Sequence, residues 1–232
     1  MSIVELVIQW FSQATTWSGP ESIPIRLAEH LLYSFLALAV AAVIAIPLGL
    51  YFGHLRKGEI FVLTTANSIR ALPTLGLLTL VVIASGIGIL PPLIALVVLA
   101  VPPMLVNAFE GVRAVDHTIV DAAKGVGMTS RSILWKVELP VALPLVLLGI
   151  RLAAIQVVSA ATIAAYVGLG GLGRFIFDGM GRRDFGQVAG GSIIIAIVAI
   201  GIEVVFIALA ALVTSPGITQ RRVLGNLAFS NS

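Results

Sequence analysis

The sequence predicts an all-α integral membrane protein with about five transmembrane helices in a single membrane domain. Of its 232 residues, 59% are hydrophobic and only 11% are charged, and the mean hydropathy is +1.09. Soluble domains carry about 25% charged residues and cannot hide so much apolar surface, because even large ones leave much of it in water. A spanning helix takes about 20 apolar residues. Five of them leave room for loops but not for a second folded domain.

Long apolar runs, separated by polar or glycine-rich stretches, define the spans. We expect them at residues 27–52, 60–89, 93–109, 140–167 and 188–213. Prolines interrupt the first three runs at Pro47, Pro73 and Pro102-Pro103. Membrane helices tolerate internal proline where neighbouring groups satisfy the freed carbonyls, so these prolines predict kinked, closely packed helices. Residues 168–186 are expected to form a glycine-rich loop before the last span.

The two ends of the chain are expected to lie outside the membrane domain. Apolar residues between Ile3 and Trp17 recur at helical spacing. This pattern is typical of an interfacial helix, with Trp10 and Trp17 at the depth of the lipid headgroups. We therefore divide the chain into an N-terminal interfacial segment (1–19), a transmembrane domain (20–214) and a polar, cytoplasmic tail (215–232).

Lysine and arginine are distributed unevenly between the loops. Eight fall on one side of the expected spans and four on the other. Because cytoplasmic loops are enriched in basic residues, we expect the N-terminus outside a bacterial plasma membrane and the C-terminus in the cytoplasm. The basic residues are scattered in short loops and form no patch. This distribution favours membrane lipid over nucleic acid as the partner of a chain with net charge +3.

The sequence carries no motif for catalysis or for a cofactor. It has no cysteine, which excludes disulfides and thiolate metal sites, and it lacks the phosphate-binding loop of ATPases. The run Gly168–Gly173 fits Gly-x-Gly-x-x-Gly, but that pattern indicates a dinucleotide site only between a strand and a helix. His30, His54 and His117 are isolated in the sequence and are interpreted as interfacial or solvated. We therefore expect no catalytic residue, metal or cofactor, and a chain that is not itself an enzyme.

The polar stretch 110–138 is the longest between the expected spans, and we expect it to form two short helices. Thr118 followed by Asp121 fits a capping box. Gly125 and Gly127 are expected to end the first helix in the left-handed conformation. An ordinary amphipathic connector is the alternative interpretation of this stretch.

A spaced motif in this stretch resembles a known family. Its members are Asp121, Ala122, Ala123, Gly127, Val137, Leu139 and Pro140. They resemble the EAA loop of ABC-importer permeases, whose pattern is Glu-Ala-Ala, three residues, Gly, nine residues, Ile-x-Leu-Pro. The spacing matches throughout, with Asp121 in place of Glu and Val137 in place of Ile. Segments between residues 27 and 214, among them Leu139-Pro-Val-Ala-Leu-Pro144, resemble the glycine betaine/carnitine/choline permeases in particular.

The resemblance implies a type I ABC-importer permease fold with a cytoplasmic coupling helix. Two permease subunits would form the pathway, separate ATP-binding cassette subunits would hydrolyse ATP, and an extracytoplasmic substrate-binding protein would deliver the substrate. Transport would proceed by alternating access, with the seven motif residues coupling it to the ATPase. The residues fit this role, because Ala122 and Ala123 are small enough for a helix to sit deep in a partner's groove. Gly127 permits a chain reversal, and Pro140 is expected to open the next span.

Several ionisable residues fall inside the expected spans. Arg70, Arg151 and Glu203 lie at similar depth when each residue rises about 1.5 Å along a helix. A charge inside a membrane is costly unless it is paired, so we expect Glu203 to pair with Arg151 or Arg70. The alternative is that each one snorkels or packs independently. As candidates for the translocation pathway we take Tyr33, Asn67, Arg70, Arg151, Gln156, Thr162, Tyr166 and Glu203.

Substrate and transport class are open at this level. Quaternary ammonium groups are usually held by aromatic rings, and Tyr33 and Tyr166 are the main candidates for that within the expected spans. Another small solute, such as an amino acid, is the alternative substrate. A secondary transporter or a membrane scaffold are the alternative classes, although no inverted repeat is found.

Overall fold

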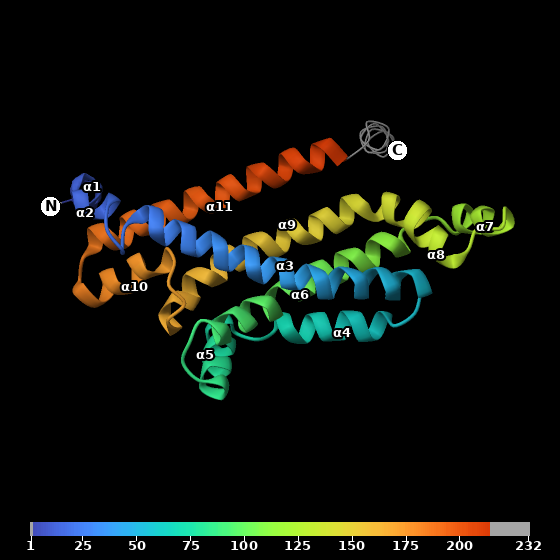
Figure 1. Cartoon of the computed structure of the whole chain (residues 1–232), viewed down its shortest axis with the longest axis horizontal. Helices are drawn as coiled ribbons and strands as arrows, with labels where there is room; N and C mark the ends of the chain where they lie inside the picture. Colours follow the sequence, from blue (N-terminus) through green and yellow to red (C-terminus); the bar gives the residue numbers. More distant parts are fainter. Residues whose placement is uncertain (1, 214–232) are drawn as a thin grey trace, which may run out of the picture.

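The computed structural model describes residues 2–213, in which every regular element is helical. Four helices there are long and apolar enough to cross a membrane, and a broken pair makes up to five. The four long ones are α3 (Ile23–Leu55), α6 (Leu90–Arg113), α9 (Leu139–Ala164) with its extensions, and α11 (Phe185–Val213). Figure 1 shows an elongated bundle with α1, α2 and α10 at one end and α7 and α8 at the other. The expected fold class is confirmed, and residues 214–232, which hold the proposed tail, lie outside the described range.

The centre of the bundle is formed by α3, α6 and α9, which pack in that order. Their backbones approach closely: a Cβ on Gly49 of α3 would lie 2.6 Å from the Leu105 carbonyl oxygen of α6. A Cβ on Gly149 of α9 would lie 2.9 Å from the Pro103 carbonyl oxygen. Lipid tails are as apolar as the side chains, so membrane helices associate through such close packing of small residues.

The second expected span is broken. Instead of one kinked helix over 60–89, α4 (Glu59–Arg70) and α5 (Thr74–Ser85) meet at a bend of 90°. Pro73 is the N-cap of α5 in an extended conformation, because proline lacks an N–H and its ring clashes with a continuing helix. Pro47 and Pro102-Pro103 remain inside continuous helices, so the sequence-based expectation is wrong for Pro73 alone.

The N-terminal segment is two helices, α1 (Ile3–Ser12) and α2 (Ala14–Trp17), because Gln13 is extended. Trp10 does not lie among headgroups: it is only 5% exposed, in an apolar cluster with Ile23, Leu172 and Phe175. Trp17 is 54% exposed, as an interfacial residue would be. The expectation of one interfacial helix is therefore corrected to a short helical pair, with α1 packed on α11.

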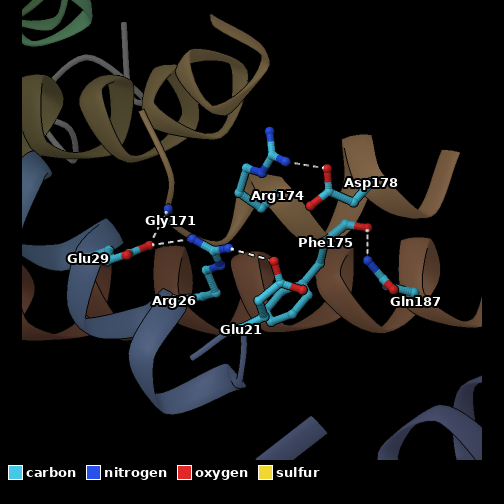
Figure 2. A network of polar contacts seen from close by, with 8 residues as sticks. All are labelled: Glu21, Arg26, Glu29, Gly171, Arg174, Phe175, Asp178 and Gln187. Atoms are coloured by element: carbon cyan, nitrogen blue, oxygen red, sulfur yellow. Dashed lines mark hydrogen bonds and ion pairs between the residues drawn. The ribbon is translucent and has the colours of Figure 1, made fainter. Parts of the chain in front are cut away.

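The expected glycine-rich loop contains a helix, α10 (Gly173–Arg182). The turn before it is tied to α3, because Gly171 N–H donates to Glu29 Oε2 at 2.9 Å. Figure 2 shows the polar network around this contact, which continues through Arg26 to Glu21 at 3.6 Å. Arg26 Nη1 also donates to Glu29 Oε2 at 2.9 Å. This corner of the chain is therefore anchored to the first long helix.

A bidentate ion pair joins α11 to α9. Arg151 Nε donates to Glu203 Oε2 at 2.9 Å, and Arg151 Nη2 contacts the second carboxylate oxygen. The side chains are 30% and 29% exposed. The expectation that Glu203 pairs with one of two arginines is confirmed. Arg70 is instead exposed in the last turn of α4.

The pairing predicts a non-additive double-mutant cycle. Glu203→Gln should destabilise the protein by about 2 kcal/mol, because it leaves the Arg151 guanidinium without its partner. The double variant Glu203→Gln with Arg151→Gln should lose less stability than the sum of the losses in the two single variants. Melting temperature in detergent measures this, with Arg70→Gln as the control. Additive losses would show that the pair contributes nothing.

The close contact of α3 and α6 predicts a strong effect from one methyl group. Gly49→Ala should destabilise the protein by about 1–3 kcal/mol, because the Cβ would meet backbone that cannot move aside. Gly201→Ala is the matched control, since a Cβ there has nothing within 4 Å. Alanine also favours a helix over glycine, so this control should melt at the same temperature or higher. Equal melting of both variants would contradict the packing argument.

Candidate functional site

The polar stretch forms two helices, α7 (His117–Gly125) and α8 (Ser130–Ile133). The cap of α7 is Asp116 and not the expected Thr118–Asp121 box. Asp116 Oδ1 accepts from Thr118 N–H at 2.8 Å, and this bond lowers the pKa of Asp116. Asp121 lies in mid-helix, exposed, 3.1 Å from Lys124 Nζ. Asp116 itself was the signal in the sequence, because aspartate is a favoured N-cap residue and its side chain accepts from an N–H two or three residues later.

Gly127 forms the reversal between the two helices. Its φ is +84°, and its N–H donates to the Lys124 carbonyl while Met128 N–H donates to the Ala123 carbonyl. These two bonds are the Schellman pattern, in which a residue with positive φ ends a helix. The expectation for Gly127 is confirmed. Gly125 is wrong as a left-handed stop, because it lies within α7 at negative φ.

The two alanines of the motif face opposite ways. Ala123 is only 8% exposed and packs in a cluster with Val115, Val120 and Ile133. It therefore stabilises the loop's own fold, and its role in coupling to a partner stays a prediction. Ala122 is exposed.

The outward face of α7 is an apolar stripe. Ile119 is 50% exposed and Val126, just past the helix end, is 80% exposed. With Ala122 they are spaced three and four residues apart, which places them on one helical face. Exposed apolar side chains beyond the membrane-spanning helices indicate a surface that another protein covers.

The end of the motif runs into the membrane helix without a break. Leu134–Glu138 form a π-helical turn, η1, which continues directly into α9. Pro140 thus sits inside one long helix that starts at Ser130, and the expectation that it opens the span is wrong. The wider π-helical turn accommodates Pro140, because the proline ring would clash with the Lys136 carbonyl, four residues before it, in a regular α-helix. Val137 packs on the α7 cluster, and Leu139 on the core below it.

Two histidines interpreted as isolated are in fact paired. His54 Nδ1 lies 2.5 Å from Glu138 Oε2, and Arg56 Nη1 lies 2.7 Å from His117 Nε2. The partners are 84 and 61 residues apart in the sequence. No local spacing could have revealed either contact.

The exposed face of α9 gathers several pathway candidates. Solvent-accessible positions recur at Leu152, Gln156, Ser159, Thr162 and Tyr166, three or four residues apart and therefore on one face. This face carries an amide, two hydroxyls and a phenol along a helix of membrane-spanning length, and sequence inspection missed Ser159. Polar side chains at such depth usually face a bundle interior or a wet cavity.

The remaining candidates are dispersed. Tyr33 packs partly buried against the core, and Asn67 and Arg70 are exposed on α4. Within residues 2–213, no hydrogen bond or ion pair ties these three to the α9 face. Nor does that range gather three or more histidine, aspartate or glutamate side chains around a common metal position.

Comparison with known proteins places the chain in a family. Residues 45–215 match the family model described as "Binding-protein-dependent transport system inner membrane component". The carnitine transport permease protein OpuCB of Listeria monocytogenes is 35% identical over 77% of this chain and 82% of its own. The glycine betaine/carnitine/choline transport system permease protein OpuCB of Bacillus subtilis is 33% identical over 83% and 89%.

Solved structures agree on the fold. The MetNI methionine ABC transporter in inward-facing conformations superposes with a TM-score of 0.71 at 21% identity, covering 93% of this chain and 100% of that one. A second crystal form gives 0.70 at 24% identity. Because the family model matches residues 45–215 and the relatives are 33–35% identical over most of the chain, the chain belongs to the family of inner membrane components of binding-protein-dependent transport systems, the permeases of ABC importers.

Proposed function

We propose that the chain is the permease subunit of an ABC importer for quaternary ammonium osmoprotectants, of the class of glycine betaine, carnitine and choline. The observation that carries the proposal is the identity of 33–35% to permeases named for these solutes, over 77–84% of the chain. The fold of a methionine importer alone would not select this substrate class. An amino acid remains the alternative substrate for the experiment below.

The α7 end of the bundle lies in the cytoplasm and the α1 end outside. The support is the excess of lysine and arginine at the α7 end, among them Arg56, Lys57, Arg113 and Lys124. In this orientation the N-terminus is outside, and α11 runs back toward the cytoplasm. The division into an outer segment 1–19, a membrane domain 20–214 and a cytoplasmic tail 215–232 follows from it.

A separate ATPase subunit binds the stripe formed by Ile119, Ala122 and Val126. The stripe is apolar, exposed and flanked by Asp121 and Lys124, which is the composition of a docking helix with a polar rim. ATP hydrolysis belongs to that partner, since this sequence has no phosphate-binding loop. The permease itself is not an enzyme. Movement of α7 under ATP binding drives alternating access.

The substrate pathway runs along the exposed face of α9, between this chain and a second permease subunit. Gln156, Ser159 and Thr162 offer polar groups there, and Tyr166 offers an aromatic ring for a quaternary ammonium group. An extracytoplasmic binding protein delivers the substrate at the α1 end. Glu203 and Arg151 neutralise each other deeper in the membrane.

Reconstitution tests the function directly. The chain, its ATPase and its binding protein in liposomes should accumulate labelled glycine betaine, carnitine or choline only when ATP is inside. The chain alone should accumulate none. Uptake of methionine in preference to these solutes would contradict the substrate class. Uptake driven by an ion gradient without ATP would instead show a secondary transporter.

The exposed stripe predicts a specific defect. Ala122→Arg should abolish uptake and weaken binding of the ATPase subunit, because a long charged side chain would enter the apolar contact, while the melting temperature of the permease stays unchanged. Ala114→Arg is the control, since Ala114 is exposed at the end of α6, off the stripe. Ala123→Arg should lower the melting temperature itself, since Ala123 is buried. Normal uptake in Ala122→Arg would contradict the docking surface.

A further inference from the structure

The segment that carries α7 and α8 is fastened to the end of α3 at two points. At the first point, His54 contacts the second half of the segment, which runs from α8 through η1. His54 Nδ1 lies 2.5 Å from Glu138 Oε2, and His54 Nε2 lies 2.6 Å from Ser130 Oγ. If the Glu138 carboxylate is ionised it can only accept, and the donor in this contact is then His54 Nδ1–H. Glu138 is 1% exposed, and a buried carboxylate left without this donor would be costly.

The second point holds the start of the segment. Arg56 Nη2 donates to the Val115 carbonyl at 2.8 Å, and Arg56 Nη1 donates to His117 Nε2 at 2.7 Å. Arg56 is the C-cap of α3 with φ +51°, a left-handed conformation that is uncommon outside glycine. The cap turns the chain so that the guanidinium reaches across to α7.

Apolar packing ties the exit of the segment to α3 through Leu134, which packs in a cluster with Leu50 of α3. The apolar cluster of the loop itself does not reach α3. That cluster consists of Val115, Val120, Ala123 and Ile133, with Met128 and Val137 against it, and includes no residue of α3. It holds α7 to α8. The polar contacts from α3 instead hold the entry and the exit of the segment, on either side of a cavity of about 580 Å³.

The end of α3 is itself immobile against α6. A Cβ on Gly53, one residue before His54, would lie 2.8 Å from the Phe109 carbonyl oxygen. A displacement of α7 that reaches His54 and Arg56 therefore reaches the packed pair α3–α6 as well. Hydrogen bonds to charged groups are directional and stronger than neutral ones, so they fix the position of the segment relative to α3.

We infer that His54 and Arg56 are positioning residues for energy coupling: they lock the α7–α8 segment to α3, so that movement imposed on α7 is passed to the membrane helices. The inference rests on the proposed function, because it needs an ATPase partner that moves α7. Neither residue touches the substrate or the proposed ATPase surface. Loss of the lock leaves ATPase binding and hydrolysis intact and lowers the amount of substrate moved per ATP.

Transport per ATP in the reconstituted importer is the first measurement. His54→Ala and Arg56→Ala should each lower the ratio of substrate to ATP about five-fold or more while ATPase binding is retained. His54→Asn should restore most of it, because the asparagine amide can replace Nδ1 as a donor to Glu138. Glu59→Gln is the control, since it removes an ion pair at the same end of the bundle, with Arg113 at 3.0 Å, but touches no residue of the lock.

A distance measurement separates this inference from the proposed function. The chain has no cysteine, so Lys57→Cys and Thr118→Cys accept spin labels at the end of α3 and on α7 alone. The label-to-label distance distribution in the assembled importer should broaden in His54→Ala and narrow again in His54→Asn. Absence of ATP-driven uptake in the unmodified importer would contradict the proposed function, and the distances would still test the lock. If the ratio of substrate to ATP and the label-to-label distance distribution were both unchanged in the two alanine variants, the inference that His54 and Arg56 lock the segment to α3 would be overturned.

Discussion

The close approach of the α3, α6 and α9 backbones is the constraint on which the rest of the structure depends. In lipid, an apolar side chain gains no hydrophobic free energy by moving from lipid to a neighbouring helix. Helices therefore associate through close packing, which small residues permit by letting the backbones touch. Gly49 and Gly149 mark the tightest points, where an added Cβ would fall within 3 Å of a carbonyl oxygen. A core built this way is rigid, and every other element is placed by its attachment to it.

The peripheral elements pack on apolar clusters, and polar contacts add specific points of attachment. Arg151 and Glu203 join α11 to α9, Glu29 holds the turn before α10, and His54 with Arg56 holds the α7–α8 segment. Each contact involves a charged side chain, and such hydrogen bonds are stronger and more directional than neutral ones. The molecule therefore combines a core packed by shape with outer parts that are also fixed at specific polar points. That combination suits a permease whose outer parts must transmit movement.

The two surfaces with functional character lie in different places. Helix α7, which carries the apolar stripe, lies at one end of the bundle (Figure 1), and the polar face of α9 runs along the length of that helix. A movement imposed on the α7 stripe reaches the polar face of α9 through the helices between them. The continuous helix from Ser130 to Val167, with its π-helical turn, and the contacts at the end of α3 provide two such routes. Both routes begin in the EAA-like loop, so the residues of this loop are placed to transmit movement to the membrane helices.

The sequence by itself determined the membrane class, the bounds of four of the five spans to within a few residues, the loop motif and the pairing of Glu203 with one of two arginines, because hydropathy, motif spacing and helical depth are local quantities. It could not determine that Pro73 breaks a span while Pro47 does not, or that Trp10 and Ala123 are buried. Nor could it find the contact of His54 with Glu138, 84 residues away. Those outcomes were decided by the tertiary structure, because each depends on which distant backbone or side chain packs against the residue.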